Sequence, residues 1–494
     1  MSDVTTVDLF ALAPELAVLA GALLVLLVEL FLPAESKRRV NAIGVISVLV
    51  ALGFVIALAT DGQARASFGN MFVVDNYALL FKAFFLSVAL FVLFMSYRYF
   101  SEFRTYQGEY YFLLLSAFLG MMLMASARDL VMIFIALELV SVPGFVMAGL
   151  RKFDLRSNEG AMKFFLIGVL SVAVLLYGLS IVYGYTGTTD LVGVAEALRG
   201  MDEPFLNASI LFVIVGFGFK ISAVPFHFWA PDTYEGAPVP VTAFLSVASK
   251  AAGFAGLLQV CFVAFEPVAH VWALPLGVIA IVTMTVGNLT ALQQTNIVRL
   301  LAYSSIGHAG YMLVPFAVVR AGETELNRTA FAAVLLYLLA YGIMNSAAFA
   351  AVVAVTRGDP TRLIADYAGL GRRAPGMATV LTLAFLSLGG IPLLVGFWAK
   401  FFVFRAAVVA GTTFAIVLAS AVVINSVIAM FYYLKVLRIM WMDEPVTDEH
   451  LRPGFALNLA ALGLTVLTVG AFFAFDLFAR AADISTLVVA ATGG

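Results

Sequence analysis

The chain has 494 residues, of which 63% are hydrophobic and only 12% are charged, and its mean hydropathy is +1.04. Soluble domains carry about 25% charged residues, so this amount of charge cannot cover a soluble surface of such length. The composition therefore predicts an integral membrane protein and excludes water-soluble enzymes and secreted modules. The net charge of −2 offers no basic field for nucleic acid.

Thiols and imidazoles are scarce, which limits metal and redox chemistry. The chain holds one cysteine and four histidines, namely Cys261, His227, His270, His308 and His450. Iron–sulfur clusters usually need four thiolates, and structural zinc usually needs several cysteines or histidines. The sequence also has neither a Walker P-loop nor a Rossmann glycine motif that opens a helix after a strand. We therefore expect no catalytic centre, cofactor or metal on this chain.

Continuous apolar runs of about 20 residues predict membrane-spanning helices. A β-barrel is not expected, because its strands would alternate polar and apolar residues over about ten positions. Fourteen runs qualify, at 9–32, 40–60, 74–97, 109–126, 129–150, 160–185, 205–227, 239–265, 269–294, 299–319, 329–355, 376–407, 412–438 and 455–478.

The distribution of lysine and arginine orients these spans. Fifteen of the 28 basic residues fall in the loops 1–2, 3–4 and so on to 13–14, and seven fall on the opposite side. The positive-inside rule therefore places both termini outside. Arg299, Arg405 and Arg438 at span ends are counted with the adjoining loops. The remaining six lie within spans and are all lysines: Lys82, Lys163, Lys220, Lys250, Lys400 and Lys435.

Lysines inside spans are costly, at roughly 2.5–3.5 kcal/mol for a charge at the bilayer centre, and such residues usually mark ion pathways. Lysine suits a relay better than arginine, because a buried lysine can lose its proton and arginine stays protonated. We interpret Lys220, Lys250 and Lys400 as relay groups, with a structural ion pair as the alternative. Lys82 and Lys435 lie nearer span ends, where a lysine can extend to the interface.

One carboxylate, Glu138, lies in the middle of the fifth span and needs a partner to stay charged. Lys163 on the next span is a candidate, although it lies only a few residues into that span. Glu15 and Glu29 in the first span have no obvious partner. His227 and His308 lie at membrane depth, where each is either a proton-relay group or a hydrogen-bonded packing histidine.

Two spans are interrupted by proline close to a lysine. The seventh contains Pro225 and Lys220, and the twelfth contains Pro392 and Lys400. Proline removes a backbone donor, and freed carbonyls survive at membrane depth only inside protein or beside water. The two spans run in opposite directions and lie five spans apart. This predicts inverted repeats of spans four to eight and nine to thirteen, with the breaks near an ion site.

The segments around these residues resemble a known family. The stretch 220–238, KISAVPFHFWAPDTYEGAP, resembles the central motif of the subunit N family of bacterial respiratory complex I, which includes mitochondrial NADH dehydrogenase subunit 2. The segments around Glu138, at 302–308 and at 390–400 fit the same family, which belongs to the antiporter-like proton-channel subunits. One departure is visible: the second break usually reads Ile-Pro-Pro, and Leu393 replaces the second proline here.

The resemblance implies a fold and a set of proton-translocation residues. The fold would be all-α, with about 14 transmembrane helices and two inverted five-helix repeats whose helices 7 and 12 are broken. Its parts would be N-terminal helices at 1–108, repeats at 109–265 and 266–440, and a final helix and tail at 441–494. The proton-translocation residues would be Glu138, Lys163, Lys220, Lys250 and Lys400, with His227 and His308 beside them.

The resemblance also implies a function and partners. The chain would be a proton-translocating subunit of NADH–quinone oxidoreductase in a bacterial plasma membrane, among other antiporter-like subunits and lipid. NADH, FMN, iron–sulfur clusters and quinone would bind to partner subunits. The L-type sister subunit is longer, and the M-type sister usually carries glutamate in place of Lys400. A subunit of a multisubunit sodium/proton antiporter is the alternative function, and a structural membrane scaffold is a third.

Overall fold

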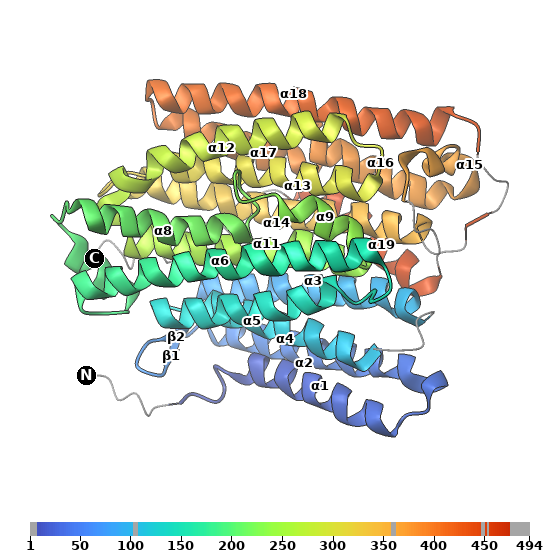
Figure 1. The fold of residues 1–494 in the computed structure, drawn as a ribbon, viewed down its shortest axis with the longest axis horizontal. Coiled ribbons are helices and arrows are strands. Elements are labelled where there is room, and N and C mark those ends of the chain that lie inside the picture. The colour runs from blue at the N-terminus through green and yellow to red at the C-terminus, as the bar shows by residue number, and fades with distance from the viewer. Residues whose placement is uncertain (1–6, 102–106, 357–361, 446–449, 452–453, 475–494) are drawn as a thin grey trace.

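The computed structural model describes residues 7–101, 107–356, 362–445, 450–451 and 454–474. Its helices run side by side in one bundle, with α1 and α2 at one edge and α18 at the opposite edge (Figure 1). Within the described residues, twelve helices are long and apolar enough to cross a membrane. Two shorter apolar helices, Pro204–Lys220 and Pro375–Gly389, form the first parts of the seventh and twelfth predicted spans, which are both interrupted.

The first part of the bundle consists of three long helices and a short antiparallel hairpin, in which Arg65 pairs with Val74. The Asp75 carboxylate accepts a hydrogen bond from the backbone N–H of Ala78 and so caps the third helix directly after the hairpin. The elements are α1 (Ala13–Phe31), the 3-10 turn η1 (Ala34–Arg39), α2 (Val40–Asp61), β1 (Arg65–Ser67), β2 (Phe72–Val74) and α3 (Asn76–Ser101).

The next five spans include the first broken helix. Asp129 caps α5, since its carboxylate accepts from the backbone N–H groups of Val131 and Met132. The elements are α4 (Gln107–Ser126), α5 (Leu130–Ala148), α6 (Leu155–Thr186), α7 (Leu191–Leu198), α8 (Pro204–Lys220), α9 (Trp229–Gly236), α10 (Val239–Phe244), the π-helical η2 (Leu245–Ser249), α11 (Lys250–Gln259) and the π-helical η3 (Val260–Ala264).

The last six spans include the second broken helix. Asn296 caps the helix that begins at Ile297, because its side chain accepts from two backbone N–H groups. The elements are η4 (Glu266–Val268), α12 (Ala269–Leu292), α13 (Ile297–Leu313), η5 (Val314–Val318), α14 (Thr324–Val355), η6 (Ile364–Tyr367), α15 (Leu370–Arg373), α16 (Pro375–Gly389), α17 (Val395–Val409), α18 (Thr413–Met442) and α19 (Phe455–Phe473).

The centre of the bundle is formed by the continuous helix from 239 to 264, by α13 and by α14. Every residue from 239 to 264 is buried, and so is most of α13 and α14. By contrast, large apolar side chains of α1, α2, α6 and α18 are exposed. In a membrane those helices face lipid, so the three central elements are the ones that shield polar groups from hydrocarbon.

The second break has an unusual backbone at the position where the resembled family has its second proline. Gly390 ends α16 with φ +91°, and Leu393 has φ +75°. Proline is locked near φ −65° and cannot adopt this left-handed conformation. The chain at Leu393 therefore follows a course that the Ile-Pro-Pro pattern does not allow, which explains the departure seen in the sequence.

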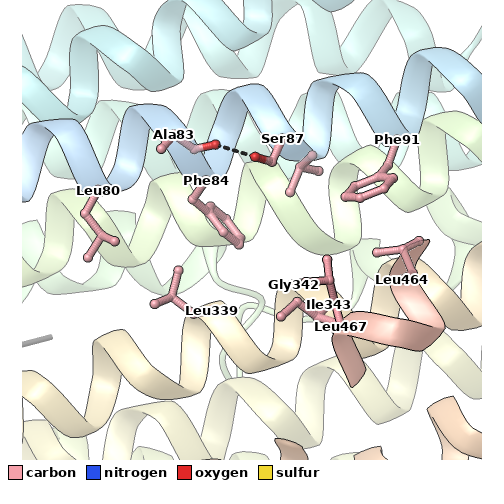
Figure 2. A pocket seen from close by; sticks show the side chains of 11 residues that line it. Leu80, Ala83, Phe84, Ser87, Phe91, Leu339, Gly342, Ile343, Leu464 and Leu467 are labelled. Carbon is pink, nitrogen blue, oxygen red and sulfur yellow. Dashed lines mark hydrogen bonds between the residues drawn. The ribbon is translucent and has the colours of Figure 1, made fainter. Parts of the chain in front are cut away.

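An apolar groove of about 340 Å³ lies between α3, α14 and α19. Its lining includes Phe84, Leu339, Gly342 and Leu467, and Figure 2 shows these side chains facing the groove from three helices. The hydroxyl of Ser87 donates to the carbonyl of Ala83 within its own helix, so it is not free for a polar ligand (Figure 2). This groove is separate from the buried lysines described below.

Candidate functional site

The first broken helix places Lys220 against the helix that carries Glu138. Lys220 is the last residue of α8, is 3% exposed, and its Nζ donates to Ser141 Oγ at 2.9 Å. Ser141 follows Glu138 by three residues, so both lie on one face of α5. Glu138 interacts electrostatically with Lys220, and its Oε1 has no hydrogen-bond partner among the described residues.

The predicted pairing of Glu138 with Lys163 is wrong. Lys163 Nζ lies 2.6 Å from carboxylate oxygens of both Glu159 and Asp232, and its side chain is 41% exposed. Lys163 lies in the third turn of α6, so its side chain stays near the N-terminal end of that helix. There it contacts Asp232 in α9, the short helix that follows the first break. Arg299 also contacts Asp232, at 2.7 Å, which links α6, α9 and α13.

Lys250 begins α11 and is buried in the centre of the bundle. Its Nζ donates to the backbone carbonyl of Ser305 at 2.6 Å and to the Ser305 hydroxyl at 2.8 Å. The π-helical η2 ends directly before it, and such π-segments occur frequently at functional sites. A Cβ added to Gly253 would lie 2.9 Å from Lys220 Cγ, so glycine at this position lets the stem of Lys220 pack closely on α11.

One face of α13 connects Lys250 to the second break. Ser305, His308 and Tyr311 follow each other at three-residue spacing, which places them along one side of the helix. His308 is 1% exposed, and its Nδ1 lies 2.8 Å from the Tyr337 hydroxyl. His308 follows Ser305, which Lys250 contacts, by three residues, and its ring centroid lies 5.7 Å from that of Tyr311, which Lys400 contacts.

Lys400 binds a backbone carbonyl that the second break sets free. Its Nζ donates to the carbonyl oxygen of Gly389 at 2.9 Å and lies 5.0 Å from the centroid of the Tyr311 ring. The last carbonyls of a helix have no partner within the helix, so Lys400 satisfies one that would otherwise be unpaired. A pocket of about 370 Å³ lies beside it, between α17 and α18.

His227 lies in the first break, between α8 and α9, and is 7% exposed. Its ring contacts that of Phe228, with centroids 4.5 Å apart, and its Nδ1 has no hydrogen-bond partner within the described part of the chain. Lys220 contacts α5, which carries Glu138, and its stem packs on α11, which carries Lys250. Lys250 and Lys400 both contact α13, which carries His308. We call Glu138, Lys220, Lys250, His308 and Lys400 the connected set. The structure leaves His227 and Lys163 outside this set.

Three further expectations about charged residues are corrected or supported. Lys82 does not reach the interface: it is fully buried, and its Nζ lies 2.8 Å from Glu15 Oε1. Glu29 also has a partner, since Lys37 lies 3.1 Å away. These partners come from other helices or from the loop after α1, which a linear sequence does not bring together. Lys435 is exposed on α18, as expected for a lysine near a span end.

The buried Glu15–Lys82 pair leads to a prediction about stability. The variant Lys82→Met should lower the amount of assembled protein, because it leaves the Glu15 carboxylate buried without a cation, a loss of about 3–5 kcal/mol. The double variant with Glu15→Gln should recover most of that stability. Arg372→Met is the control, since its exposed pair with Glu444 should contribute only about 0–1 kcal/mol. Thermal inactivation of purified variants measures the difference, and an unstable double variant would contradict the explanation.

Sequence reasoning missed several polar partners. Ser141, Ser305 and Tyr311 each contact a buried lysine or lie beside one. Their spacing from Glu138 and His308 is a signal that could have found them, because residues three apart share a helix face. Tyr337 and Tyr433 carried no such signal, since their contact with His308 depends on how three helices pack.

Comparison with known proteins supplies the family. Residues 127–429 match the family described as NADH:quinone oxidoreductase/Mrp antiporter, TM. NADH-quinone oxidoreductase subunit N of Trichlorobacter lovleyi is 42% identical, covering 90% of this chain and 89% of the relative. The protein of the same name from Dehalococcoides mccartyi is 40% identical, covering 94% of this chain and 95% of the relative.

Solved structures agree with the sequence relatives. A chain in respiratory complex I from Thermus thermophilus is 31% identical with a TM-score of 0.76, covering 97% of this chain and 100% of that one. A chain of the Mrp complex from Dietzia sp. DQ12-45-1b has a TM-score of 0.81 at 20% identity, covering 98% and 99%, and shares the fold alone. The chain therefore belongs to the NADH:quinone oxidoreductase/Mrp antiporter membrane family.

Proposed function

We propose that this chain is the subunit N-type, proton-translocating membrane subunit of an NADH–quinone oxidoreductase. The observation that carries the proposal is the connected set, which runs from the half-buried Glu138 through the buried Lys220, Lys250 and His308 to Lys400. A sodium/proton antiporter subunit is less well supported, since relatives about 40% identical are named as oxidoreductase subunits and the Mrp structure is only 20% identical.

In the proposed mechanism, protonation of one lysine disfavours protonation of the next, because like charges repel strongly in a low-dielectric interior. A shift of Glu138 relative to Lys220 changes the proton affinity of Lys220. The change passes to Lys250 on α11, because the stem of Lys220 packs on this helix at Gly253, three residues after Lys250. From Lys250 the proton moves along the Ser305–His308–Tyr311 face of α13 to Lys400, and release is to the outer side.

Two of the predicted site residues, Lys163 and His227, lie outside the proton path in this mechanism. Lys163 pairs with Asp232 and so holds α9, the helix that follows the first break, in place. His227 lies within that break. Pro225 and Pro392 keep the two spans interrupted, which frees carbonyls for polar contacts. The 109–265 and 266–440 repeats each supply one broken helix, and 1–108 and 441–494 flank them.

The redox chemistry belongs to partner subunits in this proposal. One cysteine cannot supply the four thiolates of an iron–sulfur cluster, so the clusters are assigned to other chains. NADH, FMN and quinone are likewise assigned to partner subunits in this proposal. Purification of the intact complex through a tag on this chain tests the proposal. We expect NADH-oxidising and iron–sulfur subunits to co-purify, whereas co-purification of cation/proton antiporter subunits without them would contradict it.

We propose that the chain lies in the bacterial plasma membrane with both termini outside, on the basis of its lysine and arginine distribution. Labelling with a membrane-impermeant thiol reagent tests this in cells, after Cys261 is replaced by serine. A cysteine at Arg372 should be labelled only after the membrane is opened, and a cysteine at Gly494, which lies outside the described residues, should be labelled in intact cells. The reverse pattern would contradict the orientation.

A further inference from the structure

A second polar cluster contacts the C-terminal end of α11, the helix that begins with Lys250. The proposed proton-transfer steps do not involve this cluster. Its centre is Arg128, directly before α5. Arg128 donates to Gln259 Oε1 at 2.6 Å and to Asp75 Oδ2 at 2.7 Å. Gln259 is fully buried and donates in turn to the carbonyl oxygen of Met124 at 2.8 Å. The cluster thus joins α3, the α4–α5 connection and the last residue of α11.

Tyr77 on α3 strengthens the same attachment. Its hydroxyl donates to the carbonyl oxygen of Ala255 at 2.7 Å, and the Arg128 guanidinium lies 5.5 Å from the centroid of its ring. Gln259 Nε2 also contacts the Ala255 carbonyl, at 3.3 Å. The backbone here passes from α11 into the π-helical η3, where the regular helical bonding changes. Two side chains from outside therefore hold α11 at its junction with a π-segment.

The geometry of α11 relates this cluster to Lys250. Each residue turns an α-helix by about 100°, so two residues nine positions apart lie on nearly opposite faces. Lys250 faces Ser305 on α13, and Gln259 faces Arg128 on the other side. The π-helical segments η2 and η3 flank α11. A change between π-helical and α-helical hydrogen bonding in either segment would rotate α11 about its own axis. Contacts from outside the helix are therefore needed to fix this rotation.

We propose that Gln259, held by Arg128 and backed by Tyr77, is a positioning residue that sets the rotation of α11 and so directs Lys250 toward Ser305. Arg128 also precedes α5, which carries Glu138, so one guanidinium holds the helices of two relay groups in fixed relation. The inference rests on the proposed relay function of Lys250. Its test is designed so that failure of the relay and failure of the positioning role give different results.

The experiment measures protons pumped per NADH oxidised in vesicles that contain the intact complex, together with the amount of assembled complex. Gln259→Met keeps the length of the side chain and removes its polar atoms, so the ratio should fall toward that of Lys250→Ala. Gln259→Glu keeps an acceptor for Arg128 and should restore a large part of the ratio. Gln294→Met is the matched control, since the side-chain amide of Gln294 donates to the carbonyl of Thr290, four residues earlier, and has no other hydrogen-bond partner among the described residues.

Tyr77→Phe removes a single hydroxyl and provides the test if Gln259→Met does not assemble. We expect it to lower the ratio in the same direction by a smaller amount. A normal ratio in assembled Gln259→Met, or in Tyr77→Phe where the former is absent, would overturn the positioning role, provided that Lys250→Ala lowers the ratio. A normal ratio in Lys250→Ala would instead overturn the relay on which the inference rests.

Discussion

Replacing Lys250 by alanine should abolish the share of proton pumping that depends on this chain while the complex still assembles. The ammonium is 1% exposed and donates two hydrogen bonds to Ser305, so the variant loses a proton-carrying group at the middle of the connected set. An alanine leaves an apolar helix that still inserts into the membrane. The measurement is NADH-driven proton uptake in vesicles, beside the amount of assembled complex.

The variant Lys250→Arg distinguishes a proton-relay role of Lys250 from a structural role as a buried cation. Arginine keeps the positive charge but does not release its proton in proteins, so a relay should fail in this variant too. If Lys250 only paired with buried acceptors, arginine would restore pumping and alanine would reduce assembly. Normal pumping by the alanine variant would defeat the relay role, and full rescue by arginine with poor assembly of the alanine variant would favour the structural role.

The second large effect is expected for Glu138→Gln. Glutamine has nearly the same shape but carries no charge, so movement of α5 could no longer change the proton affinity of Lys220. Because Glu138 Oε1 has no hydrogen-bond partner among the described residues, the substitution should cost little stability. We therefore expect well-assembled complex with strongly reduced pumping.

Glu159→Gln is the matched control for that variant. The Glu159 side chain is 64% exposed and pairs with Lys163 near the N-terminal end of α6, outside the connected set. It should pump as the unmodified protein does. Equal pumping by the two variants would show that a carboxylate at Glu138 has no special role.

Much of the fold could be predicted from sequence because the bilayer imposes simple rules. Apolar runs of about 20 residues gave the spans, and proline beside lysine gave both breaks. Lys220, Lys250 and Lys400 were found because a buried charge is too costly to be accidental. The comparisons bear out the fold and the family, and the roles of single residues stay predictions.

The partners of these charges could not be predicted, because partner choice depends on depth and rotation. Lys163 is near Glu138 in sequence order, yet it lies at the end of its span and binds Asp232. Lys82 was expected at the interface, yet Glu15 of α1, a helix that packs against α2 and α4, reaches its ammonium. A hydropathy profile gives the length of a helix but not which neighbour faces each of its sides.

In both broken spans the first helix ends beside a buried lysine, and this arrangement has an electrostatic consequence. Lys220 is the last residue of α8, and the ammonium of Lys400 binds the final carbonyl of α16. The aligned peptide dipoles of a helix leave about half a negative charge at its C-terminus, worth up to about 2 kcal/mol to a nearby cation. The Lys400 ammonium therefore has a counter-charge that never binds a proton itself. Lys400 can release its proton without leaving an unpaired carboxylate in the membrane interior, which the Glu15–Lys82 pair cannot do.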